Sequence, residues 1–361
     1  MRILHTESSL GWGGQEIRVL SEARGVARLG HEVLLAAPAE SRIHKEAPRF
    51  GVESRALPIG RKGIPGLLAM RTLLASRAID VINTHSSTDS WLAAVARATA
   101  SARPAIVRTR HISASVPRNA ATRWLYRQAA RIVTTGEKLR LQVIEETGAA
   151  SDAVVSVPTG IDLARFAPGG RRAAREATGL PADKTLVGIV ATLRSWKGHR
   201  YLIEAIAAMS RSNVELVIVG DGPQRSALEA QAGELRVPVR FAGNRDDVAP
   251  WLQSLDLFCL PSYANEGVPQ ALMQAMACGL PVVTTDVGSI GEIVSDGETG
   301  VLVKPEDAQA LRRAIEKLLG DEAMRRALGE AAAARARERF GEARMVERMV
   351  AAFEAARSGG R

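Results

Sequence analysis

Short apolar runs alternate with longer segments of helical periodicity along the whole chain. The apolar runs are 2–6, 32–37, 80–84, 105–109, 131–136 and 153–158 in the first half, and 186–191, 214–220, 239–242 and 257–260 in the second. Such runs predict buried strands, and the segments between them predict helices. Strands that alternate with helices predict parallel, doubly wound sheets, so we expect an α/β protein.

The alternation is interrupted once, where Gly, Ala, Arg and Pro dominate residues 168–184. We therefore expect two Rossmann-like domains, 1–167 and 185–340, joined by a linker over 168–184. Residues 341–361 are expected to form a C-terminal helix and tail, as part of a helical segment over 322–356. A chain of 361 residues is long enough for two hydrophobic cores.

Composition indicates a globular protein without a membrane-spanning helix. Apolar residues make up 46% of the chain and charged residues 24%, as is typical of folded domains. No apolar run approaches the roughly 20 residues of a membrane span, and the N-terminus lacks a signal-peptide pattern. Cys259 and Cys278 have no metal-ligand spacing. These features predict a cytoplasmic protein, for which a peripheral position on the inner face of the cytoplasmic membrane stays open.

Positive charge is concentrated in the first half of the chain. Residues 1–170 contain 23 Lys and Arg against 14 Asp and Glu, whereas residues 171–361 contain 25 of each. A basic surface can attract an anionic membrane, an acidic substrate or nucleic acid. An arginine-rich composition without a specific partner is the alternative explanation.

One expected helix in this basic half, residues 117–131, has the composition of a membrane-interface helix. Arg123, Arg127 and Arg131 recur every four residues beside Trp124, a pattern found in helices that lie at a membrane surface. A packed helix with a solvated basic face fits the same pattern.

The clearest candidate chemistry lies at residues 266–283, EGVPQALMQAMACGLPVV. Pro269 suits the first turn of a helix, and Gly279 suits its left-handed end. The start of that helix offers amides and a positive dipole to a phosphate, while Glu266 just before it can accept bonds from hydroxyls. Gln270 and Gln274 share one helical face near the same point. This combination predicts a ligand with both hydroxyls and phosphate, as in a sugar nucleotide.

A second strand-to-helix junction carries cations. Arg194 and Lys197 lie in the loop TLRSWKGH that follows the strand at 186–191. Arginine can bind phosphate with two parallel bonds, and lysine binds it as a point charge. This loop therefore suits a diphosphate.

Two features of the first half complete the candidate sites. Gly11, Gly13 and Gly14 form a loop between the first strand and helix, but Glu16 occupies the third glycine position of a dinucleotide fingerprint. His85 and His111 each follow a strand, where open α/β sheets place their ligands. We expect at least one of these histidines to work in a site.

The 266–283 stretch resembles the E-x(7)-E signature of the retaining glycosyltransferases of family 4. The positions that match are Glu266, Gly267, Ala275, Met276, Ala277, Gly279, Pro281 and Val282. Gln274 stands in place of the second glutamate, and Thr192 stands where the family has an arginine. The resemblance implies the GT-B fold, in which two Rossmann-like domains face each other across a cleft and a C-terminal helix crosses back to the first domain.

The resemblance also implies roles for individual residues. The expected catalytic residues are Glu266, His111, Arg194 and Lys197. The expected donor-binding residues are Gly13, Gly14, Thr192, Gly267, Val268, Pro269, Gln270 and Gln274. The expected acceptor-binding residues are His85, Arg110 and Glu16.

The function implied is retaining transfer of a sugar from a UDP- or GDP-sugar to a glycan or glycolipid, in bacterial lipopolysaccharide or other cell-surface polysaccharide assembly. The chain contains no D-x-D, so we expect no metal. The nucleotide-sugar would be a substrate, so we expect no cofactor, and we expect no nucleic-acid partner. Three alternatives stay open. They are a GT-B sugar-nucleotide epimerase, a dinucleotide-dependent oxidoreductase built on the glycine loop, and a basic membrane- or nucleic-acid-binding protein without turnover.

Overall fold

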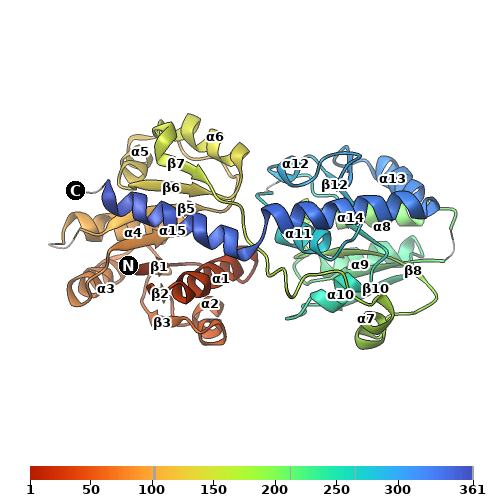
Figure 1. Cartoon of the computed structure of the whole chain (residues 1–361), viewed down its shortest axis with the longest axis horizontal. Coiled ribbons are helices and arrows are strands. Elements are labelled where there is room, and N and C mark those ends of the chain that lie inside the picture. Colours follow the sequence, from red (N-terminus) through yellow and green to blue (C-terminus); the bar gives the residue numbers. More distant parts are fainter. Residues whose placement is uncertain (101–102, 212, 265, 360–361) are drawn as a thin grey trace. The chain divides into compact units, whose positions relative to one another are not determined.

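The computed structural model describes residues 1–100, 103–211, 213–264 and 266–359. The chain forms two compact units, which Figure 1 shows with their helices and strands labelled. Met1–Gly160 and Glu342–Arg361 make up the first unit, and Ile161–Gly341 the second. The C-terminal segment therefore belongs to the same unit as the N-terminus.

The first unit is built on a seven-stranded sheet in the order β3-β2-β1-β4-β5-β6-β7. All its strand pairs are parallel. The strands are β1 (Arg2–Thr6), β2 (Glu32–Ala37), β3 (Glu53–Ala56), β4 (Val81–Thr84), β5 (Ala105–Arg110), β6 (Arg131–Thr134) and β7 (Val154–Ser156). The helices are α1 (Gly14–Arg28), α2 (Arg42–Glu46), α3 (Ile64–Ser76), α4 (Ser87–Ala98), α5 (Ala120–Arg127), α6 (Glu137–Thr147) and α15 (Glu342–Ser358).

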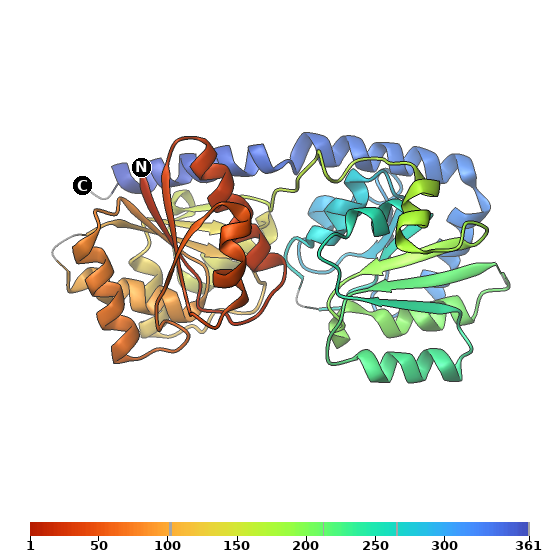
Figure 2. The ribbon, with the colours of Figure 1, turned by 90° about the horizontal axis from the view of Figure 1, so that it is seen from below.

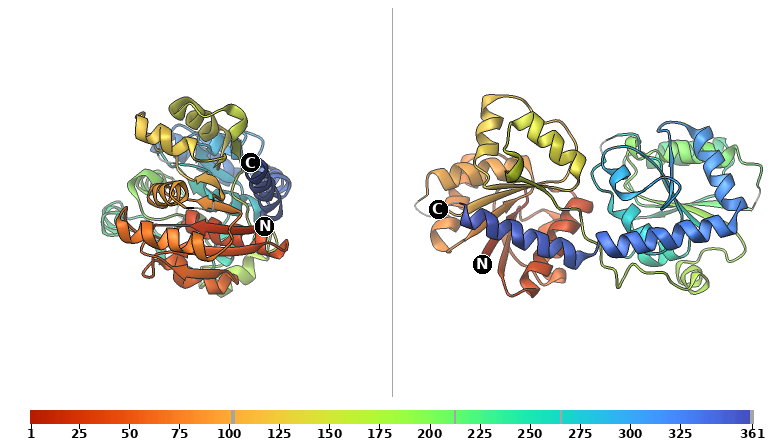
Figure 3. Two further views of the ribbon diagram at one scale, coloured as in Figure 1. Left: turned by 90° about the vertical axis from the view of Figure 1, so that its left-hand side faces the viewer. Right: turned by 45° about the horizontal axis from the view of Figure 1, so that its top comes forward.

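Successive side chains along each strand face opposite sides of the sheet, so this unit has two layers of hydrophobic core. Leu4 of β1 and Ile82 of β4 pack against α3 and α4, whereas Ile3 and Val81 face the other side and pack with Phe353 of α15. Helices α1 and α15 cover this second face together, and Figure 3 shows the blue α15 lying along the first sheet.

The second unit contains a six-stranded parallel sheet in the order β10-β9-β8-β11-β12-β13. The strands are β8 (Thr185–Val190), β9 (Val214–Val219), β10 (Val239–Gly243), β11 (Leu257–Leu260), β12 (Val282–Thr285) and β13 (Val301–Val303). The helices are α7 (Arg171–Thr178), α8 (His199–Ala207), α9 (Arg225–Glu234), α10 (Ala249–Gln253), α11 (Gln270–Ala277), α12 (Ile290–Ile293), α13 (Ala308–Gly320) and α14 (Glu322–Arg339). Helices α8 and α9 lie on one face of this sheet, and Figure 2 shows them in green.

Each sheet reverses its strand order at one point. In the first unit the reversal lies between β1 and β4, and in the second between β8 and β11. Loops that leave two such strands diverge to opposite faces, so a crevice opens at the carboxyl ends of the strands. These two points are where ligand sites are expected.

The predicted α/β architecture of two parallel sheets is confirmed, and most expected strands agree with the structure to within two residues. The expected helix at 117–131 is shorter than predicted, because α5 covers only Ala120–Arg127 and Arg131 begins β6. The predicted stripe of three arginines is therefore wrong, and only Arg123 and Arg127 share the helix.

The segment expected as a linker, 168–184, contains helix α7. Arg175 explains why this helix is held in the second unit: it is 6% exposed and donates to the carbonyls of Ser254 and Ala182 and to the Asp256 carboxylate, at 3.0, 2.9 and 2.7 Å. A buried guanidinium with this many partners fixes the helix in place.

The expected C-terminal helix at 322–356 is two helices, α14 and α15. They are separated at Phe340 and Gly341, where the Phe340 carbonyl accepts from the amide of Ile161 at 2.8 Å. That bond belongs to a short parallel bridge between Ile161 and Gly341, so the helical ladder ends there. Within the described residues no helix is both long and apolar enough to cross a membrane.

Candidate functional site

The switch point of the second unit holds an ion pair whose carboxylate is buried. Glu266 follows β11 and is 3% exposed. Its Oε1 accepts from the Lys197 ammonium at 2.6 Å and from the Ser262 hydroxyl at 2.6 Å. Lys197 arrives from the loop after β8, on the other side of the strand reversal. The two residues singled out at separate junctions of the sequence thus meet in one cluster.

Close contacts between backbones hold the loops of this cluster together. Gly198 has φ +76°, and a Cβ there would lie 1.9 Å from the carbonyl oxygen of Pro261. Gly288 has φ +60°, and a Cβ there would lie 1.9 Å from the carbonyl oxygen of Glu266. Glycine is needed at both positions for its conformation and for its size. Each side of the ion pair is therefore fixed by main chain.

Helix α11 begins directly after this cluster. Pro269 occupies the N-cap position with φ −71° and ψ 116°, so it precedes the helix rather than forming its first turn. Gln270 and Gln274 are partly exposed on one side of the helix, and Gly279 takes the left-handed conformation expected of it, with φ +77°. The positive end of the helix dipole therefore lies beside Glu266 and Lys197. Gly267 and Val268, in the turn between Glu266 and α11, are partly exposed.

The other cation of this unit lies at the surface. Arg194 is exposed, and its guanidinium carbon lies 5.7 Å from the ring centroid of Trp196. Thr192 is exposed in the same loop. The structure therefore separates the two predicted cations, because only Lys197 contacts the buried carboxylate.

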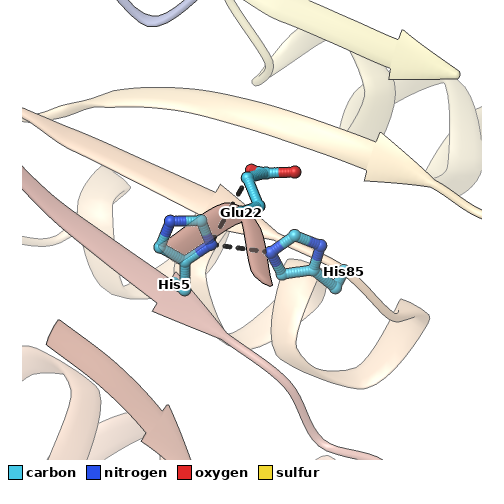
Figure 4. Close-up of side chains that lie close together, drawn as sticks. All are labelled: His5, Glu22 and His85. Atoms are coloured by element: carbon cyan, nitrogen blue, oxygen red, sulfur yellow. Dashed lines mark hydrogen bonds and ion pairs between the residues drawn. The ribbon is translucent and has the colours of Figure 1, made fainter. Parts of the chain in front are cut away.

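The switch point of the first unit holds a chain of three histidines. His5 Nδ1 lies 3.0 Å from His85 Nε2, and His85 Nδ1 lies 3.0 Å from His111 Nε2. His5 and His85 are buried and His111 is partly exposed. Figure 4 shows the first two rings with Glu22 of α1, whose Oε1 lies 4.0 Å from His5 Nδ1.

The sheet register explains why the three rings meet. His5 pairs with Asn83, so His85 lies two residues beyond the partner of His5. Asn83 pairs with Val107, so the same register places Thr109 opposite His85, and His111 lies two residues beyond Thr109. A two-residue offset keeps all three side chains on the same face and makes them diagonal neighbours. The chain consequently leads from the interior of the sheet to its carboxyl edge.

Burial keeps these rings neutral. It lowers the pKa of His5 to about 3. Burial also lowers the pKa of His85 and His111 well below the usual value, with the positive charge of Arg18 acting in the same direction. Burial raises the pKa of Glu22 to about 7, although Arg18 opposes that shift.

A network of polar side chains fixes Glu22. Its Oε1 accepts from the Asn83 amide at 2.9 Å, and the Asn83 carbonyl accepts from the Thr109 hydroxyl at 2.8 Å. Among the described residues, one group has a spacing that would suit a metal ion. It consists of His5, Glu22 and His85, whose possible ligand atoms all lie within 4.8 Å of one another.

Two further buried carboxyls lie at this switch point. Asp89 accepts from the Thr6 hydroxyl at 2.7 Å and from the amides of His85 and Ser86 at 2.9 Å each, which caps α4. Burial raises its pKa. Burial, together with the charge of Asp89, raises the pKa of Glu7 to about 8.

The glycine loop lies between this cluster and α1. Gly11 and Gly13 do not adopt positive φ, so the loop does not need glycine for its conformation. The carboxylate of Glu16, 6% exposed, lies below the loop, with oxygens 3.9 and 3.8 Å from where Cβ atoms of Gly11 and Gly13 would be. Arg110 bonds to the Tyr126 hydroxyl at 3.4 Å, so its guanidinium lies against α5.

Sequence reasoning had not identified His5, Glu22 and Asn83 as functional candidates. All three are buried and resemble ordinary core positions in the sequence. The strand register brings His5 to Asn83, and the packing of α1 on the sheet brings Glu22 to both. Asp89 did have a local signal, because Ser86 and Asp89 form the S-x-x-D pattern of a capping box.

Solved structures share this architecture. That of Anabaena Alr3699/HepE in complex with UDP matches with a TM-score of 0.86 at 22% identity, over 97% of this chain and 99% of that chain. Sucrose-phosphate synthase from Thermosynechococcus elongatus matches with a TM-score of 0.83 at 23% identity, over 98% of both chains. The two parallel sheets thus define a protein of the GT-B class.

Sequence comparison identifies the family. The model described as "Glycosyl transferases group 1" matches residues 170–335, and the model described as "Glycosyltransferase Family 4" matches residues 12–165. Phosphatidyl-myo-inositol mannosyltransferase of Mycolicibacterium smegmatis is 30% identical over 333 residues, covering 87% of this chain and 83% of the relative. D-inositol 3-phosphate glycosyltransferase of Mycobacterium bovis is 35% identical over 198 residues, covering 52% and 40%. The chain belongs to the family 4 glycosyltransferases, as the 266–283 stretch predicted.

The neutral His5 makes an acid-sensitive contribution to the stability of the first unit. Between pH 6.5 and about 3, the unfolded chain binds a proton at His5 that the folded chain does not. The free energy of unfolding therefore falls as the pH falls, by about 2 kcal/mol at pH 5 for this ring. Glu22 and Glu7 act in the opposite direction, because their raised pKa favours the folded state as the pH falls.

The difference in free energy of unfolding between wild type and His5→Leu isolates the contribution of His5 to the pH dependence. Urea unfolding at pH 7.5 and pH 5 should show that the stability gap between the two proteins shifts by about 2 kcal/mol in favour of the variant at pH 5. A gap that is the same at both pH values would contradict a neutral, buried His5.

Proposed function

We propose that this protein is a retaining glycosyltransferase, which moves a sugar from a nucleotide-sugar donor to a hydroxyl of a glycan or glycolipid. The observation that carries the proposal is the cluster of Lys197, Glu266 and Ser262 beside the start of α11. It combines a fixed cation and a helix N-terminus, which suit a diphosphate, with a carboxylate that suits sugar hydroxyls.

In the proposed reaction the bond between the anomeric carbon and the diphosphate oxygen breaks. The acceptor oxygen bonds to the same carbon on the same face, and the acceptor proton passes to the leaving phosphate. Lys197 and the amides at the start of α11 stabilise the negative charge that develops on the diphosphate. Glu266 orients the sugar hydroxyls. We assign Arg194, on its exposed loop, a supporting contact to the diphosphate.

We further propose a UDP- or GDP-sugar donor. A neighbour of the same fold, Alr3699/HepE, has been solved with UDP and with UDP-glucose. Gln274 would accept from the ribose hydroxyls through its carbonyl, and Gln270, Gly267 and Val268 would line the same end of the helix. We propose that the transfer needs neither a metal nor a cofactor.

The acceptor is proposed to be a hydroxyl-rich headgroup or glycan, bound at the carboxyl edge of the first sheet. The relatives named above act on phosphatidyl-myo-inositol and on D-inositol 3-phosphate, both of which carry a cyclic polyol with a phosphate. The first unit, with 26 Lys and Arg against 16 Asp and Glu, suits an anionic acceptor of this type. Assembly of a bacterial cell-surface glycan is the proposed process.

A direct test combines donor binding with product analysis. We expect UDP- or GDP-sugars, but not NAD, to raise the melting temperature, and a glycosylated inositol phosphate or phosphatidylinositol to form with the anomeric configuration of the donor retained. EDTA should leave turnover unchanged. A sugar nucleotide that is consumed without any acceptor-linked product would support the epimerase instead, and no thermal shift with any nucleotide would contradict the donor site.

Replacement of Gln274 by glutamate should restore a charged acceptor for the ribose. Hydrogen bonds to an ionised acceptor are roughly twice as strong as neutral ones, so we expect the donor to bind about threefold to tenfold more tightly, as measured by calorimetry. Gln231→Glu on α9 is a suitable control, since Gln231 bonds to the Arg200 carbonyl away from the cluster. Weaker nucleotide binding in Gln274→Glu would contradict the ribose assignment.

We also propose that α3 attaches the first unit to an anionic membrane. Ile64 and Leu68, one turn apart on α3, are 72% and 54% exposed, and Arg61, Lys62 and Arg71 surround them in an exposed position. Apolar side chains within a basic rim suit the boundary between headgroups and acyl chains.

The double variant Ile64→Glu/Leu68→Glu should bind vesicles that contain phosphatidylglycerol at least about tenfold more weakly, since each apolar side chain contributes roughly 1.5 kcal/mol or more on burial. Sedimentation with vesicles measures this, and Leu235→Glu, at an exposed apolar site of the second unit, should bind as wild type does. Equal binding of the double variant and wild type would show that α3 is not the attachment surface.

A further inference from the structure

The histidine chain of the first unit admits only two arrangements of protons. Each of its two bonds joins a ring nitrogen to a ring nitrogen, at 3.0 Å. A neutral imidazole carries one N–H and one lone pair, so each bond needs one N–H and one acceptor. The tautomer of any one ring therefore determines the tautomers of the other two.

The two arrangements differ in what His111 presents at the edge of the sheet. If His5 donates from Nδ1, then His85 donates from Nδ1 to His111 Nε2, and His111 carries its proton on Nδ1. If the direction is reversed, His111 donates from Nε2 inward, and its Nδ1 bears a lone pair. In the first case His111 is a hydrogen-bond donor to a ligand, and in the second case it is a base.

Glu22 distinguishes between these arrangements. Its Oε1 accepts from Asn83 and therefore bears lone pairs whether or not the carboxyl is ionised. This oxygen lies 4.0 Å from His5 Nδ1. In an interior of low dielectric, an acceptor oxygen at that distance favours an N–H over a second lone pair at Nδ1. The Asn83 amide that donates to Glu22 is itself held, because its carbonyl accepts from the Thr109 hydroxyl.

We propose that Glu22 and His5, acting through His85, are positioning residues that fix His111 as a neutral donor with its proton on Nδ1. On the proposed function, on which this role of His111 rests, its N–H would bond to an oxygen of the sugar or acceptor and would not remove the acceptor proton. Front-side transfer, in which the leaving phosphate takes that proton, needs a donor of this kind and no protein base.

The ring geometry favours a proton chain over a metal ion. The His5 and His85 rings lie within 6° of parallel, and their facing nitrogens are 3.0 Å apart, which is a normal distance for a hydrogen bond. Two nitrogens bound to a tetrahedral zinc, each at about 2.0 Å, would lie about 3.3 Å apart. Phe353 of α15 packs edge-on against His5 and closes the buried end of the chain.

Nitrogen NMR of protein with ¹⁵N-labelled histidine tests the proposal without any substrate. We expect His5, His85 and His111 all to carry their proton on Nδ1 at pH 7.5. A proton on Nε2 of His111, or one equivalent of zinc in the purified protein by mass spectrometry, would overturn the proposal. If the tautomers are as expected and the protein transfers no sugar, only the proposed function fails.

The variant Glu22→Leu tests the role of the acceptor oxygen. It should shift a measurable fraction of His111 to the Nε2–H form and lower kcat about tenfold, with donor KM unchanged. Glu22→Gln keeps an acceptor oxygen at this position and should retain the wild-type tautomers. Glu342→Leu is the matched control, because Glu342 pairs with Arg24 of α1 at 2.8 Å without touching the histidines. Tautomer populations identical in Glu22→Leu and wild type would show that Glu22 does not set the direction, and the wild-type spectrum decides the main proposal even if the variant does not fold.

Discussion

Replacement of Glu266 by alanine is expected to lower kcat/KM for sugar transfer by about 1000-fold, measured by product formation at saturating acceptor. The carboxylate is 3% exposed and bonds to both Lys197 and Ser262. Its loss removes the group that orients the sugar hydroxyls. It also removes the hydrogen bond that holds the Lys197 ammonium in the position where it should contact the diphosphate. Loss of one preorganised group of this kind costs about 100- to 1000-fold, and here two functions are affected together.

The effect should fall on turnover more than on nucleotide binding. In Glu266→Ala the Lys197 ammonium loses its anionic partner, so the affinity for free UDP or GDP should be kept or increased while kcat falls. Glu229→Ala is the matched control, because Glu229 forms an exposed pair with Arg225 on α9 and should transfer sugar at the wild-type rate. Turnover of Glu266→Ala within threefold of wild type would remove Glu266 from the mechanism.

Conservative replacement separates charge from shape at the same position. Glu266→Gln keeps an oxygen for the Ser262 hydroxyl and for the Lys197 ammonium, but without the negative charge. Charge-assisted bonds are roughly twice as strong as neutral ones, so we expect an activity between those of wild type and the alanine variant. An activity equal to that of Glu266→Ala would indicate that charge, rather than hydrogen-bond geometry, is what the cluster needs.

The strands and the Glu266 junction could be predicted from the sequence because both depend on local patterns. Buried parallel strands appear as apolar runs, and β1, β2 and β11 have the predicted bounds. The meeting of Lys197 with Glu266 was not predictable in the same way. It depends on β8 and β11 being neighbours across the strand reversal, which no local pattern specifies.

The histidine chain shows the same limit. His85 and His111 were candidates because they follow strands, but His5 lies inside β1 and resembles an ordinary core position in the sequence. The chain depends on an offset of two residues between neighbouring strands. A register shift of one residue would turn the rings to opposite faces.

The predicted bounds of the helix at 117–131 and of the linker at 168–184 differ from the structure because tertiary contacts override the local sequence pattern. Arg131 follows a helical pattern, yet it begins β6 because its backbone pairs with Val107 of β5. Residues 168–184 have the composition of a linker, yet Arg175 holds α7 to the second unit through the carbonyls and carboxylate it bonds. In both cases the deciding partner lies far away in the sequence.

Replacement of Gly198 by alanine should lower the free energy of unfolding of the second unit by about 3 kcal/mol or more and also impair transfer. The left-handed conformation alone costs a residue with a Cβ about 1–2 kcal/mol. In addition, the new methyl would lie 1.9 Å from the Pro261 carbonyl oxygen. Backbone atoms cannot rotate out of the way, so the loop after β8 must move away from β11, and the Lys197 ammonium moves with it.

Gly297→Ala is the control that separates these two costs. Gly297 has nearly the same conformation, with φ +72°, but nothing lies within 4 Å of its added Cβ. It should therefore lose only the conformational part, about 1 kcal/mol, and keep its activity. Urea unfolding and transfer rates of the two variants measure the difference. Equal losses would show that the contact between Gly198 and Pro261 is not tight.

A Gly198→Ala variant that is less stable but fully active would show that Lys197 does not need its loop held at this distance. The diphosphate would then have to be stabilised mainly by the amides of α11.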